Sequence, residues 1–178
     1  MRLLAALCLL SSCASHGPTD VEAAARAQAA LAPFKKSLKQ SLLEELGKST
    51  VSAVEVCATR APELAREASV DGVRVGRSSE KLRNPRNSPP AWLIPVMEEL
   101  TRAPAETTAT RVVDLGGGKR GYAESIRIEA PCLLCHGATI APDVAAKISE
   151  HYPEDRARGY ELGDFRGVFW VELDPIAP

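Results

Sequence analysis

The feature that most constrains this chain is the pentapeptide Cys132-Leu133-Leu134-Cys135-His136. Its two thiols are separated by two residues, and an imidazole follows directly. Haem c attachment needs two cysteines that can add across the vinyl groups of one porphyrin, with a histidine beside them to reach the iron. The pattern therefore predicts covalently attached haem c, held by Cys132 and Cys135, with His136 as the first axial ligand.

Two other kinds of site use closely spaced cysteines. A redox-active Cys132–Cys135 disulfide would be expected after a strand in a βαβ unit, and the sequence gives no such pattern. Zinc would need further ligands at firm spacing; Cys57 is conceivable, but His16 lies in a linker and His151 has no paired neighbour. Haem remains the favoured prediction, and His151 is expected to be solvated or locally hydrogen-bonded.

The N-terminus has the features of an export signal. Arg2 precedes the apolar run from Leu3 to Leu10, and small residues then lead into Cys13, as at a bacterial lipobox. A plain secretory signal without lipid is the alternative. The expected division is residues 1–12 as lipoprotein signal peptide, 13–20 as a linker with a lipidated Cys13, and 21–178 as one haem-binding domain.

An anchor of this kind would hold the domain on a membrane surface without spanning it. The apolar run is much shorter than the roughly 20 residues that a membrane-spanning helix needs, and no later segment is longer. We therefore expect a periplasmic protein that is lipid-anchored to a bacterial membrane and has no transmembrane helix.

Composition places the rest of the chain among globular proteins. Its 178 residues are 45% hydrophobic and 25% charged, which suits one domain with one core. The formal net charge is -1, so no excess of basic residues is available for phosphates. We expect no nucleic-acid partner.

One cysteine is left without a role by these predictions. Four of the five are accounted for: Cys8 leaves with the signal, Cys13 carries lipid, and Cys132 and Cys135 hold haem. In an oxidising compartment a stable unpaired thiol calls for a chemical role. Cys57, expected on the inner face of a helix, is the preferred second axial ligand, because a thiolate stabilises ferric iron. Met97 is the other candidate, although its apolar helical context favours the core.

Periodicity predicts helices first and strands afterwards. A helix capped by Asp20 is expected to break or bend at Pro33, and Gly116 to Gly118 should form a hairpin turn. The further helices are expected over 34–46, 51–61, 92–100 and 143–149, and the strands over 73–76, 110–115, 122–128 and 165–173. Residues 78–90 should form an irregular loop. This order indicates an α+β fold with an antiparallel sheet.

Several separate segments, in this order along the chain, resemble bacterial haem-c-binding sensor domains with a PAS-like fold. These segments are Ala53 to Cys57, Ala61-Pro62, Gly76 to Ser79, Lys81 to Pro89, Cys132 to Gly137 and Gly163 to Gly167. The resemblance implies a PAS-like α+β domain whose haem iron is bound by the motif histidine and by a cysteine of an N-terminal helix. These positions correspond to His136 and Cys57.

The resemblance also suggests a role for a basic loop. Arg77, Lys81 and Arg83 could neutralise the haem propionates through charge-assisted hydrogen bonds, the alternative being a solvated basic loop. We expect no signalling domain beyond Pro178, so that output would pass to a separate redox or signalling protein.

The expected function is a redox or diatomic-gas sensor with His/Cys ligation, and not an enzyme. A periplasmic electron-transfer cytochrome c is the alternative. A haem peroxidase would need acid–base groups at an open distal site, for which His151 alone is a weak candidate.

Overall fold

The computed structural model describes residues 19–175. The predicted signal peptide, Cys13 and nearly all of the linker lie outside these residues. Within them no helix combines the length and the apolar character needed to cross a membrane.

Two helices open the fold. Helix α1 spans Asp20–Leu46 and helix α2 spans Thr50–Glu67. The cap of α1 is Thr19 and not the predicted Asp20, because the Thr19 hydroxyl accepts from the Glu22 amide while the Glu22 carboxylate accepts from the Thr19 amide. Gly47 caps the C-terminus of α1, and Ser49 caps the N-terminus of α2.

Pro33 was expected to break or bend the first helix, and it does not break it. Helix α1 continues through Pro33, which lies on the exposed side. A proline removes one helical hydrogen bond, but Leu31 and Phe34 on either side are 1% and 3% exposed and hold the helix on the sheet. Burial of that apolar stripe outweighs the local cost, which propensity alone could not show.

The sheet has four antiparallel strands in the order β1-β4-β3-β2. The strands are β1 (Val73–Ser78), β2 (Thr110–Gly116), β3 (Lys119–Arg127) and β4 (Phe165–Leu173). The β2–β3 hairpin turns at Gly116, Gly117 and Gly118, all with positive φ, as the glycine run predicted. The α+β architecture with an antiparallel sheet is confirmed.

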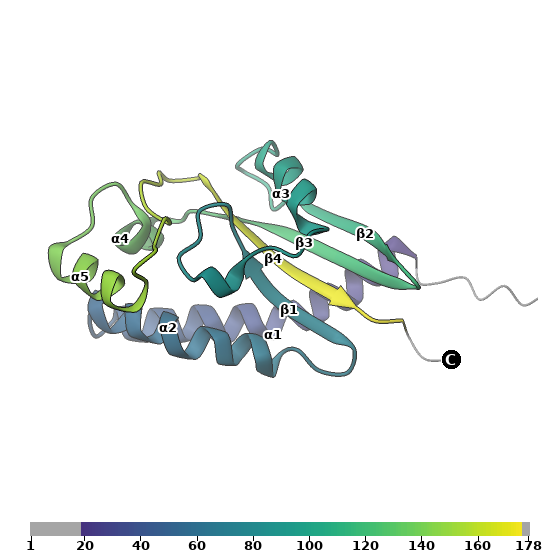
Figure 1. Cartoon of the computed structure of the whole chain (residues 1–178), viewed down its shortest axis with the longest axis horizontal. Helices are drawn as coiled ribbons and strands as arrows, with labels where there is room; N and C mark the ends of the chain where they lie inside the picture. The colour runs from purple at the N-terminus through teal and green to yellow at the C-terminus, as the bar shows by residue number, and fades with distance from the viewer. Residues whose placement is uncertain (1–18, 176–178) are drawn as a thin grey trace, which may run out of the picture.

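Helices cover the two faces of the sheet differently (Figure 1). Helices α1 and α2 run side by side along one face, where Leu31 and Phe34 pack against Tyr122 and Val171. Helix α3 (Leu93–Thr101) covers the opposite face. Met97 is 3% exposed within that α3 layer, which makes it a core residue rather than an available ligand beside α2.

Short helices gather at one end of the molecule (Figure 1). They are the 3-10 turns Pro85–Asn87 and Ala130–Cys132, helix α4 (Leu133–His136) and helix α5 (Pro142–His151). Helix α5 packs on α2 through Val144 and Ile148, which contact Val54. The Cys-Leu-Leu-Cys-His motif therefore lies at this end, shortly after the end of β3 and in contact with α2.

Strand β4 contains a β-bulge at the same end. Ile126 pairs with Gly167 and Arg127 pairs with Phe165, so Arg166 is an extra residue with no partner position on β3. Gly167 has φ 146°, and a Cβ there would lie 2.2 Å from the Ser78 carbonyl oxygen. The bulge therefore depends on glycine at this position.

Alanine at Gly167 should destabilise the protein by about 3–5 kcal/mol, because positive-φ strain adds to a backbone overlap. Urea unfolding followed by circular dichroism measures the change. The control is Gly117→Ala, where φ is 59° but no atom lies within 4 Å of the added Cβ; it should cost only about 1–2 kcal/mol. Equal losses in the two variants would contradict the overlap.

Candidate functional site

The motif cysteines lie on one short helical segment. The 3-10 turn ends at Cys132 and α4 begins at Leu133, which brings Cys135 one turn after Cys132. Cys132 packs against the apolar group around Ile128, and Cys135 against the group between α2 and α5. Both thiols are free, so each is available for covalent attachment.

His136 is oriented by a backbone carbonyl. Its Nδ1 lies 2.8 Å from the carbonyl oxygen of Ala157, and the ring meets the Tyr160 ring edge-on with centroids 6.2 Å apart. A carbonyl can only accept, so Nδ1 carries the proton and Nε2 keeps a lone pair. This is the usual arrangement of a metal-ligating histidine.

The surroundings of His136 keep its imidazole neutral. Its pKa is lowered from 6.5 to about 3, mainly by burial and in addition by the positive charges of Arg166 and Arg83. A neutral imidazole with Nε2 unprotonated is the form that binds iron.

Arg83 holds the loop that carries Ala157. Its Nε and Nη2 donate to Asp155 at 3.1 and 3.3 Å, and Nη2 also donates to the carbonyls of Cys135 and Ala157. The Asp155 side chain is 1% exposed, and hydrogen bonds from Arg83 and Arg158 lower its pKa although burial alone would raise it. Arg83 therefore fixes the 155–157 loop against α4, whereas its predicted contact with a propionate stays a prediction.

Cys57 faces the motif from helix α2. Its thiol is half-buried; burial raises its pKa, and the nearby charges of Arg77 and Arg83 act in the opposite direction. Burial raises the pKa of the Cys135 thiol, and a negative charge on Cys57 would raise it further, so the two thiols share one environment. The structure thus brings the second predicted ligand to the motif across a long stretch of sequence.

The other two predicted basic residues lie around the same end. Arg77, on β1, is half-buried, and within residues 19–175 its guanidinium has no hydrogen bond or ion pair. Lys81 is exposed, with its Nζ 4.9 Å from the centre of the Tyr160 ring. Both cations lie where an anionic group could meet them.

These residues fit a haem group by their chemistry. Two free thiols lie beside a neutral imidazole with an unprotonated Nε2, and a third thiol lies nearby. Among the described residues, the Arg77 cation has no counter-ion. Zinc fits less well: among the described residues no three or more His, Cys, Asp or Glu side chains form a group that could hold a metal ion. All strands of the described sheet are antiparallel, so the βαβ context of a redox disulfide is also missing there.

Residues 18–173 match the Tll0287-like family. The chain belongs to the Tll0287-like family. A solved structure described as the crystal structure of the cyanobacterial heme-protein Tll0287 is similar to it, with 26% identity and a TM-score of 0.60. The similarity covers 83% of this chain and 93% of that one. The comparison with curated proteins gives no match. Membership of this family confirms the family resemblance that the sequence motifs indicated.

Sequence reasoning missed several residues of this Tll0287-like site. Asp155, Ala157 and Tyr160 lie in a stretch without periodicity, and nothing local indicated that it folds back onto His136. Arg166 had a signal, because it lies inside the Gly163 to Gly167 segment that carried the resemblance. Its role was not assigned.

The environment of His151 was predicted incorrectly. It was expected to be solvated or locally hydrogen-bonded, but its Nε2 is buried and has no hydrogen-bond partner among residues 19–175. Its ring lies beside that of Tyr152, with centroids 6.3 Å apart. His151 is the last residue of α5, whose Ile148 face packs on α2, and it is half-buried there.

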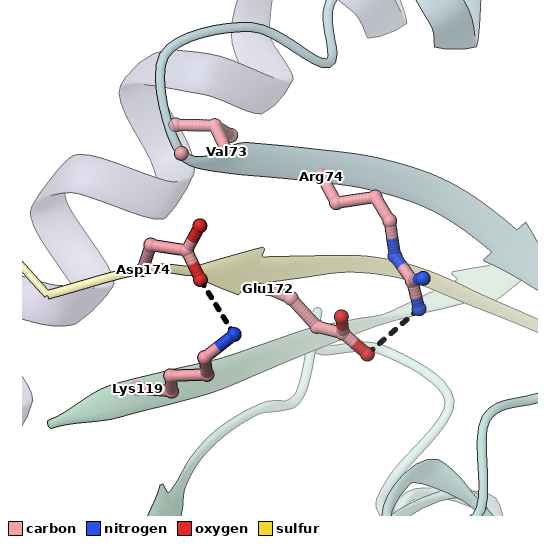
Figure 2. A pocket seen from close by; sticks show the side chains of 6 residues that line it. Val73, Arg74, Lys119, Glu172 and Asp174 are labelled. Carbon is pink, nitrogen blue, oxygen red and sulfur yellow. Dashed lines mark hydrogen bonds and ion pairs between the residues drawn. The ribbon is translucent and has the colours of Figure 1, made fainter. Parts of the chain in front are cut away.

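A hollow at the other end of the sheet does not compete as the site (Figure 2). It lies where Gly72 and Val73 meet the end of β4. Its charged groups pair with one another, Arg74 with Glu172 and Lys119 with Asp174, each at 2.9 Å. These exposed pairs hold strand ends together and leave no charge for a ligand.

Proposed function

We propose that this member of the Tll0287-like family is an exported c-type haem protein that acts as a redox or diatomic-gas sensor rather than as an enzyme. Cys132 and Cys135 would carry haem c, with His136 and Cys57 as the axial ligands. The observation that supports this most is His136 itself, whose Nδ1 is bound to Ala157 so that Nε2 is left for iron. The similarity to a protein described as a heme-protein agrees with it.

The bound haem would supply an iron that changes oxidation state and can take a diatomic gas. The chain's own contribution is to bring two ligands from two different elements. His136 is fixed by the 155–157 loop, whereas Cys57 belongs to α2, which packs on α1 and α5. A change in how Cys57 is held would therefore act on the helical layer, which is what a sensor needs to reach a partner.

Attachment is tested on protein matured with a cytochrome c assembly system. A denaturing gel should stain for haem at the mass of the chain, and a pyridine haemochrome spectrum should show thioether-linked haem. A colourless gel would exclude covalent attachment.

Sensing and electron transfer are separated by carbon monoxide. If Cys57 is released on reduction, the reduced protein should bind carbon monoxide rapidly, since an anionic sulfur is held less well by ferrous iron. Absorption spectra recorded after mixing measure this. Reduced protein that refuses the gas would instead support a fixed ligand pair and an electron-transfer cytochrome.

The anchor and location are also part of the proposal. Cys13 would carry lipid and hold the protein on the periplasmic side of a bacterial membrane, where it meets a separate redox or signalling partner. Mass spectrometry of the mature N-terminus should find a lipid-modified Cys13, and a chain cut elsewhere would overturn the anchor.

A further inference from the structure

The bulge in β4 sets the direction of the Arg166 side chain. In a regular strand residue 166 would share a face with Val168 and Trp170, which pack against α3. Phe165 takes that place instead and packs in the α3 layer. The extra residue reverses the alternation, and the Arg166 guanidinium lies over the Tyr160 ring, 5.5 Å from its centre.

Among the described residues the Arg166 guanidinium has no anionic partner. Arg166 is half-buried, and within residues 19–175 no hydrogen bond or ion pair reaches it. Burial lowers the pKa of Arg166, and Arg83 and Arg77 act in the same direction. A cation taken out of water without a counter-charge is costly, and the Tyr160 face offsets only part of that cost.

The neighbouring carboxylate does not supply the missing charge. Asp155 lies close enough to influence Arg166, but its oxygens are held by Arg83 and Arg158. Arg77 is also unpaired within the described part of the chain, so the half-buried side chains at this end carry more positive than negative charge. Of these cations, Arg166 lies over the Tyr160 ring, which also meets the ring of His136 edge-on.

We propose that Arg166 binds a propionate carboxylate of the haem and so fixes the orientation of the porphyrin over His136, an inference that rests on the proposed function. A guanidinium fork matches a carboxylate in shape and charge, and a cation already placed by the backbone loses little entropy on binding. The bulge in β4 directs Arg166, the Tyr160 ring supports its guanidinium, and no counter-ion among the described residues occupies it. These three features together favour the binding of an anion.

The test compares iron mesoporphyrin with its dimethyl ester, titrated into the unloaded full-length chain. Mesoporphyrin has ethyl groups in place of vinyl groups, so no thioether can form, and the ester lacks the propionate charges. Arg166→Gln should weaken mesohaem binding about tenfold or more, the value of a charge-assisted hydrogen bond, and leave binding of the ester unchanged. Arg166→Lys keeps the charge and should fall between.

Arg156→Gln is the matched control. Arg156 lies in the 155–157 loop, and its side chain is exposed. The substitution Arg156→Gln therefore removes the same charge as Arg166→Gln without changing the proposed propionate site, and it should not alter the ratio of the two affinities. Circular dichroism confirms that each variant is folded, and Arg166→Lys provides the comparison if Arg166→Gln is not.

A ratio of mesohaem to ester affinity equal to that of the wild type in both Arg166 variants would overturn the role of Arg166. The proposed function would still stand if the matured wild type stains for haem. A matured wild type without haem stain would instead overturn the proposed function, and the role of Arg166 with it.

Discussion

Replacing Cys132 and Cys135 together by alanine should abolish covalent haem, so that the band stained on a denaturing gel falls to background. No other cysteine among the described residues lies on the helical segment that presents His136, so no thiol can take their place. The fold should survive, because both residues are only partly buried at the end of the sheet. The measurement is haem stain per mass of protein, with circular dichroism to check folding.

The single variants sharpen this expectation. Cys132→Ala and Cys135→Ala each leave one thiol, so a haem held by one thioether should remain visible at reduced yield. Cys57→Ala is the control, since its thiol is expected to serve as a ligand and not as an attachment point. Full staining in the double variant would show that the motif does not carry the haem.

Replacing Cys57 by alanine should change the iron's second ligand while covalent haem remains. Thiolate ligation stabilises ferric iron, so its loss should raise the midpoint potential by on the order of 0.1 V or more, within the roughly 0.8 V that axial ligands span. Electron paramagnetic resonance of the oxidised protein should lose the low-spin signals of a thiolate-bound haem.

Met97→Leu is the matched control for Cys57. Met97 is the other sulfur side chain considered as a ligand, but it lies in the α3 layer on the opposite face of the sheet from α2. Its replacement should leave both the spectrum and the potential as in the wild type. An unchanged spectrum in Cys57→Ala, or thiolate signals lost in Met97→Leu, would contradict ligation by Cys57.

Many of the helices, strands and turns could be predicted from short stretches of the sequence. The glycine run at 116–118 predicted the β2–β3 hairpin, because glycine readily adopts the positive φ found at these three positions. Helix α1 is not broken at Pro33 because its contact with the sheet keeps it continuous. Rules based on neighbouring residues do not include that tertiary contact.

The sequence by itself determined the chemistry of the motif, since the spacing of Cys132, Cys135 and His136 is a property of five neighbouring residues. It also singled out Cys57, by leaving it as the one thiol without a role. Only the tertiary structure decided what surrounds His136: the Ala157 carbonyl that sets its tautomer and the Arg166 charge that a bulge turns toward it. Those contacts join segments far apart in the chain, and their positions follow from sheet register and helix packing rather than from any local pattern.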